Sequence, residues 1–349
     1  MKTALVLGGG GFIGNAMVSR LKQEGYWVRS VDLKYPEFGV TEADHFVIRD
    51  LREYPEVEQL IGYAGSNRGP WQTWSRHFDL PFDEIYQFAA DMGGAGYIFT
   101  GEHDADIMHN SATINLNVLS AQAKYNELHK VNKTKIFYSS SACIYPAYNQ
   151  TIAEAPECRE KTAYPAQPDS EYGWEKLFSE RLYASYARNK GIPVRVARYH
   201  NIYGPKGTWE GGREKAPAAI CRKVIEARDM GEIEVWGDGH QTRSFLYIDD
   251  CIDATRALME SDFEGPVNIG SEEMVTINQL VDLACVIAGK QLRKKHDTTK
   301  PQGVRGRCSD NELIEQTLGW TPKFQLMSGL AETFYWIKDQ IDEQKAHVA

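Results

Sequence analysis

Tyr172 and Lys176 have the residue types and the spacing of an acid–base pair. They lie four positions apart in the segment DSEYGWEK, so on a helix they would share one face. A lysine ammonium beside a phenol lowers the phenol pKa toward neutrality, and the phenol can then exchange a proton with a substrate hydroxyl. The same spacing also occurs on ordinary amphipathic helices with a surface lysine. The pair therefore predicts proton transfer at a hydroxyl, and the elements around it must support that function.

A strand and a helix are expected to position this pair. The run IFYSSSACIYP at 136–146 is apolar and then rich in hydroxyls, as in a buried strand that ends at a site. Its Ser141 could hydrogen-bond the same substrate hydroxyl. The helix is expected to begin near Pro168, with Asp169 or Ser170 as its cap.

A glycine-rich turn follows the first apolar segment of the chain. Residues 3–7, TALVL, are predicted to form a strand, and GGGGFIG follows with the spacing G-x-x-G-x-x-G. Glycines there allow a tight turn, close approach of a pyrophosphate and close packing of a helix on a sheet. The phosphates would bind the free amides at the start of that helix. The residues predicted to contact a dinucleotide here are Gly8, Gly11, Phe12, Ile13 and Gly14.

Residues at the ends of later strands extend the predicted cofactor site. The strand YWVRSVD ends in Asp32, whose carboxylate would accept hydrogen bonds from both ribose hydroxyls and repel a 2′-phosphate. NAD is therefore favoured over NADP. Asp50 and Leu51 end the next strand, HFVIRDLR, and are placed for the adenine end of the cofactor. Ala89 and Ala90 end the strand that begins EIYQ, and they are small enough to let a cofactor pass.

Composition restricts the class of protein. A chain of 349 residues is expected to form one large domain or two unequal ones. The net charge of −9 argues against nucleic acid as a partner, and no apolar run approaches the length of a membrane span. The start MKTALVLGGGG is predicted to be a strand, not a signal peptide. The six cysteines lack metal-binding spacing, so no metal is expected, and free thiols are typical of the cytoplasm.

The second half of the chain carries candidate ligand-binding residues. Lys215 begins a predicted helix after the glycine-rich segment GTWEGGRE, where a side chain can reach into a cleft, although a solvent-exposed lysine fits the position as well. Arg243 lies on a predicted strand, and GVRGR adds Arg305 and Arg307. Arginines beside tight glycines suit bidentate binding of phosphate. Glycines in the loop DMGGAG permit close approach to a ligand.

Taken together, these motifs resemble the extended short-chain dehydrogenase/reductase superfamily, in its nucleotide-sugar branch. The glycine turn, Asp32, SSSACIYP, the Tyr-x-x-x-Lys pair and RYHNIYGP carry this resemblance. Within the branch, the chain is similar to the GDP-mannose 3,5-epimerase family in AADMGGAG, EYGWEK, HNIYGPKGTWEGGREKAPAA, WGDGHQTRSF, PVNIGS and GVRGRCSDN. Two features depart from that family. Leu7 stands where a threonine is usual, and the region 53–80, expected to be a helix fragment plus a loop, is longer.

The resemblance implies a reaction without net redox change. Tyr172, assisted by Lys176 and Ser141, would take the proton of the sugar 4-hydroxyl while hydride passes to NAD, and the 4-ketone would acidify the hydrogens on C3 and C5. Cys143 would remove a proton from one face of each carbon, and Lys215 would deliver one to the other face. A cysteine at a strand end is otherwise often a small core residue, but a thiol near a lysine can be partly thiolate. The implied product is GDP-L-galactose, with the 5-epimer GDP-L-gulose as a second product.

The resemblance also implies a set of substrate contacts. Asn201 and Arg243 would bind the diphosphate, and Gly93 would face the sugar. Glu214 would either orient Lys215 or form a surface salt bridge. The full set of implied substrate contacts is Gly93, Ser141, Cys143, Asn201, Glu214, Lys215, Lys223, Arg243 and Arg305.

The order of predicted elements is that of an α/β fold with a doubly wound parallel sheet and a smaller α/β substrate-binding domain. A Rossmann domain that binds NAD is expected over 1–196 and 234–264. The nucleotide-sugar-binding domain is expected over 197–233 and 265–349. The superfamily resemblance implies a homodimer formed through long helices, one of which is predicted over 104–130.

Alternative functions remain open at this point. A 4,6-dehydratase, 4-epimerase or 4-reductase of the same branch would differ at Cys143, because related dehydratases carry Glu there and simple 4-epimerases Thr. A 3,5-epimerase acting on another GDP-sugar, such as a modified heptose, is compatible with the departure at 53–80. A non-enzymatic NAD-sensing protein on the same fold is a further alternative, although such proteins usually lose the Tyr or the Lys.

Overall fold

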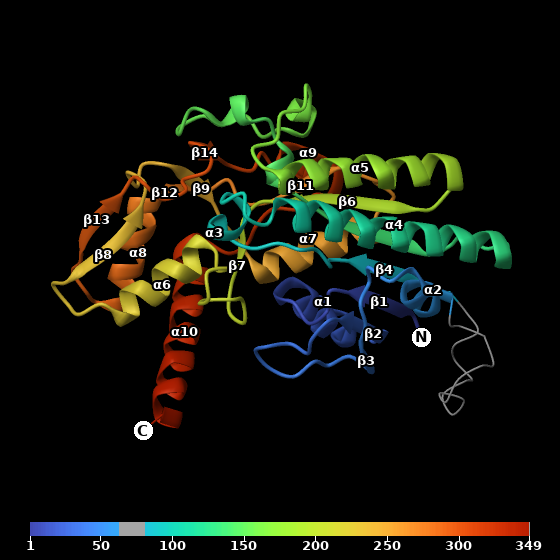
Figure 1. Ribbon diagram of the computed structural model, residues 1–349, viewed down its shortest axis with the longest axis horizontal. Helices are drawn as coiled ribbons and strands as arrows, with labels where there is room; N and C mark the ends of the chain where they lie inside the picture. Colours follow the sequence, from blue (N-terminus) through green and yellow to red (C-terminus); the bar gives the residue numbers. More distant parts are fainter. Residues whose placement is uncertain (63–80, 349) are drawn as a thin grey trace.

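A seven-stranded parallel sheet forms the centre of the larger part of the molecule (Figure 1). The structure is a computed structural model that describes residues 1–62 and 81–348. The strand order is β11-β6-β5-β4-β1-β2-β3, and the order reverses between β1 and β4, as in doubly wound folds. The predicted fold class is therefore confirmed. The strands are β1 (Thr3–Leu7), β2 (Trp27–Asp32), β3 (His45–Ile48), β4 (Glu84–Gln87), β5 (Lys135–Ser141), β6 (Val194–Tyr199) and β11 (Val267–Ile269).

Helices cover both faces of this sheet because its strands are apolar on both sides. In β1, Ala4 and Val6 pack in one core with Met17 and Leu21, whereas Leu5 and Leu7 pack in another core on the opposite face. The first core lies under α1 (Phe12–Gln23) and α7 (Ile248–Glu260). The second lies under α2 (Tyr54–Gly62), α4 (Asp104–His129) and α5 (Glu171–Lys190). The long helix predicted over 104–130 is α4.

The smaller part lies on the left in Figure 1 and is built around two short sheets. One has the order β12-β9-β14, and the other pairs β13 with β8. Their strands are β8 (Glu232–Trp236), β9 (Thr242–Ser244), β12 (Met274–Thr276), β13 (Arg293–Asp297) and β14 (Gly306–Arg307). A further pair, β7 (Ile202–Tyr203) with β10 (Leu246–Tyr247), adjoins them. The helices here are α3 (Ala95–Ile98), α6 (Ala216–Glu226), α8 (Ile277–Ala288) and α10 (Leu326–Val348), whereas α9 (Glu312–Leu318) lies beside β11 of the large sheet (Figure 1).

The division into two parts differs from the expected ranges. β11 was expected in the smaller domain, but it pairs with β6 in the large sheet, with Val267 opposite Ala197. β9, and β8 from residue 234 onward, were expected in the Rossmann domain, but both strands lie in sheets of the smaller part. Such short strands carry no sign of the sheet they join, because their partners are distant in sequence. Of the irregular region 53–80, the structure describes α2, and residues 63–80 lie outside the described residues.

Within residues 1–62 and 81–348, no helix combines the length and the apolar character that a membrane crossing requires.

Candidate active site

The glycine turn after β1 is packed so closely that side chains would not fit in it. Gly8 has a φ of 84° and lies against the backbone that follows β4, where a Cβ atom would come within 2.6 Å of the Ala89 nitrogen. A Cβ on Gly14 would overlap the Gly8 carbonyl oxygen. The Gly11 amide donates to that same carbonyl at 3.1 Å, and α1 begins with Phe12 and Ile13. The predicted cofactor residues of β1 and β4 are thus brought together.

Asp32 lies at the end of β2 and faces the same turn. One carboxylate oxygen accepts a hydrogen bond from the Gly10 amide at 2.9 Å, and the other accepts from the Leu33 amide at 2.7 Å. After β3, the neighbouring strand of the sheet, the Asp50 carboxylate accepts a hydrogen bond from Arg52 Nε at 2.9 Å, and Leu51 is buried. The glycine turn and the backbone amides at the start of α1 fit the phosphates of NAD. The Asp32 carboxylate, on the neighbouring strand, fits the ribose.

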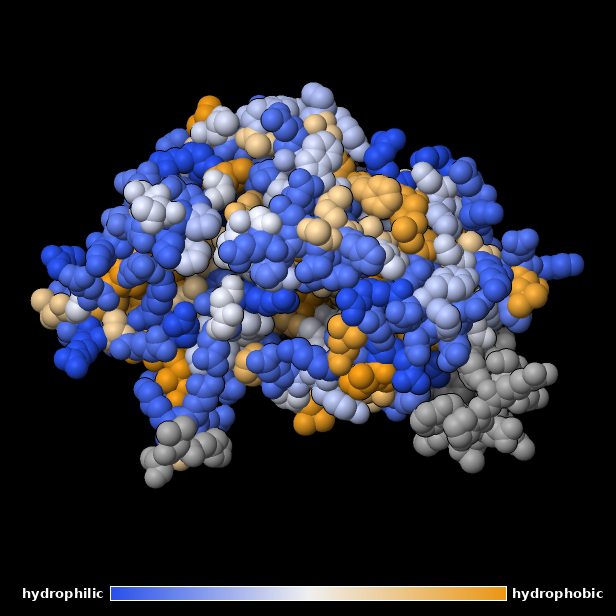
Figure 2. Space-filling model, viewed as in Figure 1, coloured by the Kyte–Doolittle hydropathy of each residue, from blue (hydrophilic) through white to orange (hydrophobic). Residues whose placement is uncertain are grey.

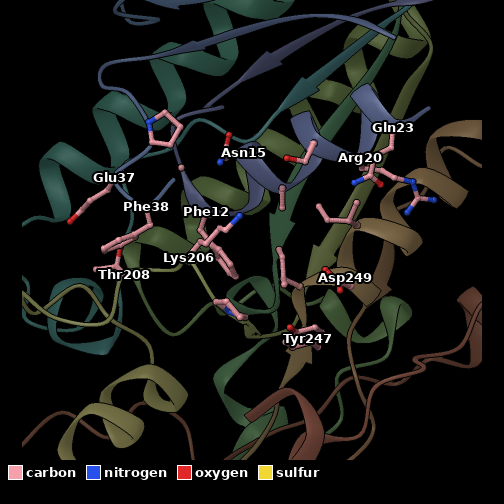
Figure 3. A pocket seen from close by; sticks show the side chains of 18 of the residues that line it. Phe12, Asn15, Arg20, Gln23, Glu37, Phe38, Lys206, Thr208, Tyr247 and Asp249 are labelled. Carbon is pink, nitrogen blue, oxygen red and sulfur yellow. The ribbon is translucent and has the colours of Figure 1, made fainter. Parts of the chain in front are cut away.

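A cavity of about 530 Å³ opens beside this turn, between α1, the segment after β2, the loop 205–208 and the start of α7. Figure 3 shows Phe12 and Asn15 of α1 among its lining residues, together with Phe38 and Lys206. Part of the glycine turn, Gly10 and Gly11, lines it as well. The cofactor turn is therefore open to solvent on its α1 side.

Ser141 and Cys143 occupy the turn that leaves β5. The Ser141 hydroxyl accepts a hydrogen bond from the Cys143 amide at 3.2 Å and so caps the short turn Ala142–Ile144. The first turn of α5 rests directly on this segment, because a Cβ on Gly173 would overlap the Cys143 carbonyl oxygen. Glycine at position 173 therefore allows Tyr172 and Cys143 to lie close together.

Tyr172 and Lys176 share one buried face of α5, as the sequence predicts. Ser170 caps this helix by accepting from the Gly173 amide at 3.2 Å. Lys176 Nζ lies 5.7 Å from the centre of the Tyr172 ring and donates to the Ser139 carbonyl at 2.9 Å. The expectation that the lysine lowers the phenol pKa is not met: burial raises the pKa of Tyr172, Cys143 acts in the same direction, and the nearby Ser141 hydroxyl offsets only part of the effect. Burial likewise lowers the pKa of Lys176, so desolvation dominates this pair.

Lys215 forms the cap position of α6, and the loop before it brings it to the same site. Burial lowers the pKa of Lys215, and the nearby Cys143 acts in the opposite direction. The two residues, distant in sequence, therefore lie near each other in the structure. Pro217 lies in the first turn of α6 and makes a firm helix start directly after Lys215.

Arg307 on β14 belongs to this site, although Arg305 is the residue that sequence reasoning chose. Arg307 Nη1 donates to Cys143 Sγ at 3.1 Å, and Nη2 donates to Asp169 at 2.7 Å. Arg305 instead donates to both oxygens of Asp238 at 2.9 Å, and with Asp169 it lines a second cavity of about 610 Å³. The motif GVRGR offers two arginines in similar settings, so sequence could not decide between them. Asp169, considered from sequence only as a helix cap, is the ion-pair partner of Arg307.

The two residues expected at the diphosphate differ in their surroundings. Arg243 is held by two carbonyl groups, donating to Thr242 at 2.7 Å and to Gln302 at 3.1 Å. Burial, together with Arg307, lowers the pKa of Arg243 to about 10. No carboxylate of the described residues hydrogen-bonds Arg243, so an anionic ligand would be its natural partner. Asn201 has a φ of 48° between β6 and β7, and its amide donates to the Ser244 carbonyl at 2.9 Å.

The remaining predicted substrate residues lie on loops and helix ends around the site. Gly93 packs against Tyr97, where a Cβ would lie 2.7 Å from the tyrosine Cβ. Glu214 accepts from Arg222 at 3.2 Å and from the Gly212 amide at 2.6 Å, so it forms the salt bridge and does not orient Lys215. Lys223 pairs with Glu234 at 3.2 Å.

Trp236, at the end of β8, is a residue that sequence reasoning did not single out. Its ring lies 5.8 Å from Lys223 Nζ and 5.9 Å from Lys300 Nζ. An aromatic face between two cations suits a flat, electron-rich base joined to phosphates. Among the described residues, no group of His, Cys, Asp or Glu side chains has the arrangement of a metal site.

Known proteins resemble this chain in both sequence and structure. Residues 4–270 match the NAD dependent epimerase/dehydratase family. GDP-mannose 3,5-epimerase of Arabidopsis thaliana is 41% identical over 343 residues, which cover 98% of this chain and 83% of that protein. GDP-L-fucose synthase of Escherichia coli is 28% identical and covers 74% of this chain and 81% of that protein. UDP-glucose 4-epimerase of Thermotoga maritima, solved with UDP-glucose, has a TM-score of 0.80 at 25% identity, covering 97% of this chain and 99% of that one.

A second solved structure shares the fold. UDP-glucose 4-epimerase of Thermus thermophilus, in complex with NAD, has a TM-score of 0.76 at 22% identity over 96% of this chain and 99% of that one. The resemblance drawn from the sequence motifs is confirmed by the family match and the sequence relatives. The chain belongs to the NAD-dependent epimerase/dehydratase family, uses NAD as its cofactor, and is related over nearly its whole length to GDP-mannose 3,5-epimerases.

Proposed function

We propose that this protein is a GDP-mannose 3,5-epimerase, which converts GDP-D-mannose to GDP-L-galactose. The observation that carries the proposal is the meeting of Cys143 and Lys215 beside Tyr172 in one site. A simple 4-epimerase needs only the tyrosine–lysine pair, whereas inversion at C3 and C5 needs two further proton-transfer groups. The 41% identity to the Arabidopsis enzyme over nearly the whole chain supports the same substrate.

Tyr172 is placed to exchange the proton of the sugar 4-hydroxyl. When bound, NAD would supply reversible hydride transfer at C4. The Ser141 hydroxyl lies near the phenol, and Lys176 keeps its ammonium 5.7 Å from the ring. Because burial raises the pKa of Tyr172, the phenol favours its protonated form, and the neighbouring Lys176 ammonium favours loss of the proton.

Cys143 and Lys215 are proposed to exchange the protons on C3 and C5. A ketone at C4 makes the hydrogens on both neighbouring carbons acidic, because the carbanion is stabilised as an enolate. Removal of a proton from one face and delivery to the other inverts the carbon. Burial of Lys215 lowers its pKa from the usual lysine value, which brings the ammonium closer to the range in which it can donate a proton.

Cations around the second cavity are proposed to bind the GDP moiety. Arg243 lacks a carboxylate partner among the described residues and suits the diphosphate. Asn201 is proposed to contact it as well. Lys223 and Lys300 beside Trp236 suit the base and its phosphates, and Arg305 lines the cavity of about 610 Å³. Gly93 remains the proposed contact to the sugar.

The first test is incubation of the purified protein with GDP-mannose in heavy water, followed by NMR and mass spectrometry. Deuterium at both C3 and C5, with new L-sugars, is the expected result. Deuterium at C5 alone, with GDP-L-gulose as product, would indicate a 5-epimerase whose C3 step is idle. Absence of exchange with NAD bound would overturn GDP-mannose as the substrate and direct the work to other nucleotide sugars.

Variants assign the roles within the same assay. Cys143→Ala is expected to abolish deuterium incorporation while NAD remains bound, and retained exchange would remove Cys143 from the mechanism. Tyr172→Phe is expected to abolish turnover. A protein that only senses NAD would show no turnover in either form, so the comparison separates an enzyme from a sensor.

We further propose that the protein is a cytoplasmic homodimer formed through α4 and α5. Trp174 and Phe178 are one helical turn apart on α5 and are 41% and 48% exposed, and Leu116 on α4 is 41% exposed. Figure 2 shows apolar side chains among polar ones over these helices. All six cysteines are unpaired, which supports a reducing compartment.

A further inference from the structure

Arg307 connects the proposed base, Cys143, to a buried carboxylate. Its guanidinium donates to Cys143 Sγ at 3.1 Å, to Asp169 at 2.7 Å and to Gln150 at 2.6 Å. Arg307 is 5% exposed, Gln150 is fully buried, and the Asp169 side chain is 7% exposed. The guanidinium, Gln150 and Asp169 are therefore shielded from bulk water, where charge interactions are strong, and Cys143 is partly exposed.

The groups that act electrostatically on Cys143 are mostly cations. Lys176 and Tyr172 face it from α5, Lys215 from the head of α6, Arg243 from β9 and Arg307 from β14. Carboxylates that act on these cations partly offset their positive charge. Glu175 and Glu180 act on Lys176, and Asp169 acts on both Arg243 and Arg307.

The proposed reaction places a specific demand on the thiol. An epimerase works in both directions, so its two proton-transfer groups must each be able to hold a proton and to lose it. A cation hydrogen-bonded to sulfur favours the thiolate and makes it a weaker base. An uncompensated Arg307 hydrogen-bonded to the sulfur, with Lys215 and Arg243 nearby, would favour loss of the proton and oppose its return.

We propose that Asp169 neutralises Arg307 and thereby keeps Cys143 able to carry its proton as well as to lose it. Asp169 is thus a positioning residue that acts through Arg307, and the proposal rests on the proposed role of Cys143 in proton transfer. Asp169 also accepts a hydrogen bond from Ser170, the cap of α5, at 3.3 Å. The carboxylate that neutralises Arg307 therefore lies at the start of α5, the helix that carries Tyr172.

The test is the pH dependence of Cys143 alkylation in the NAD-bound protein without substrate. Iodoacetamide is the probe, and peptide mass spectrometry resolves Cys143 from the other five cysteines. In Asp169→Asn, the amide oxygen can still accept from Arg307, but the negative charge is gone. The alkylation midpoint is expected to move to lower pH by about one unit or more, a tenfold change in the thiolate-to-thiol ratio. An unchanged midpoint, or a move to higher pH, would overturn the proposal.

A double-mutant cycle shows whether Asp169 acts through Arg307. Arg307→Met alone is expected to move the midpoint to higher pH. In that background, Asp169→Asn should have a clearly smaller effect, because the cation that Asp169 hydrogen-bonds is gone and only its electrostatic effect on Arg243 remains. A shift of full size in the Arg307→Met background would overturn the assigned route. Arg307→Met also keeps the proposal open to refutation if Asp169→Asn alone does not fold.

Glu84→Gln provides the matched control. Glu84 pairs with the buried Arg256 at 2.7 Å, so this variant removes a carboxylate charge from a similar buried pair away from Cys143. Its midpoint should stay within a few tenths of a unit of the wild type. Because alkylation is read without substrate, it is independent of turnover. Failure of deuterium exchange with GDP-mannose would count against the proposed function alone, and failure of the midpoint shift against the role of Asp169 alone.

Discussion

Asp32 combines two tasks at the residue scale, because it accepts backbone hydrogen bonds from Gly10 and Leu33 and is also the carboxylate expected to bind the NAD ribose. Asp32→Ala removes both the ribose acceptor and the support of the glycine turn. A hydrogen bond to a charged group contributes roughly 1.5–3 kcal/mol, so NAD affinity should fall about 10- to 100-fold. Calorimetric titration of NAD into protein stripped of cofactor measures this.

Asp44→Ala is the matched control for that variant. Asp44 also accepts a backbone hydrogen bond, from Val28 at 2.7 Å, and it pairs with Lys22 at the other end of the strand. It should change stability slightly and leave NAD affinity unaltered. Equal affinity in wild type and Asp32→Ala would mean that the ribose is held by other residues.

At the scale of elements, the DMGGAG loop packs against the loop that precedes Lys215 and so positions Lys215. The Arg213 guanidinium lies 4.0 Å from the centre of the Tyr97 ring, and the Tyr97 hydroxyl donates to Asp91 at 2.8 Å. The Gly94 amide donates to the Arg213 carbonyl at 3.0 Å. The DMGGAG loop, expected from sequence only to approach a ligand closely, therefore also holds the segment that precedes Lys215.

Arg213→Ala should loosen this contact and raise KM while lowering kcat. A cation over an aromatic ring contributes about 0.5–2 kcal/mol, so kcat/KM should fall roughly 2- to 30-fold. Steady-state kinetics with GDP-mannose measures both parameters. Arg228→Ala, at an exposed position after α6, is the control and should leave both unchanged. A wild-type kcat/KM in Arg213→Ala would show that the two loops hold together without this side chain.

His200, which follows β6, should make the fold sensitive to acid. It is fully buried, its Nε2 lies 3.0 Å from the Asn268 side-chain oxygen, and burial lowers its pKa from 6.5 to about 3. Between these values the unfolded chain binds a proton that the folded chain does not, so the free energy of unfolding falls as pH falls. From pH 7 to pH 5 the loss from this group should be about 2 kcal/mol.

Denaturant unfolding of wild type and His200→Asn at both pH values checks this expectation. The variant should be less stable at pH 7 but should lose less on acidification. His240→Asn, at an exposed position, should keep the wild-type pH dependence. Equal losses in wild type and His200→Asn would assign the acid sensitivity to other groups.

The proposed dimer is a property of the whole molecule. Trp174 and Phe178 are exposed on the same side of α5. A charge introduced in the middle of an apolar interface would destabilise that interface. Phe178→Glu should therefore shift the protein from dimer to monomer by sedimentation velocity, with NAD still bound. Tyr335→Glu, on the 55% exposed Tyr335 of α10, should leave the assembly unchanged. A wild-type protein that sediments as a monomer would contradict the dimer outright.

The sequence by itself determined the features that depend on near neighbours. The spacing of Gly8, Gly11 and Gly14 requires a tight turn between a strand and a helix. The four-residue spacing of Tyr172 and Lys176 places them on one helix face. These relations follow from backbone geometry, in which residues one turn or two positions apart have set directions. The order of strands and helices then leads to a parallel sheet whose strand ends meet at one edge.

Only the tertiary structure decided which charges meet. Arg307 contacts Cys143 across 164 positions and Asp169 across 138, and no local pattern distinguishes it from Arg305. Glu214 pairs with Arg222 and not with Lys215, and burial, not Lys176, dominates the pKa of Tyr172. The physical reason is common to all of these. Desolvation and ion pairing depend on what surrounds a group in three dimensions, and that environment comes from segments far apart in the chain.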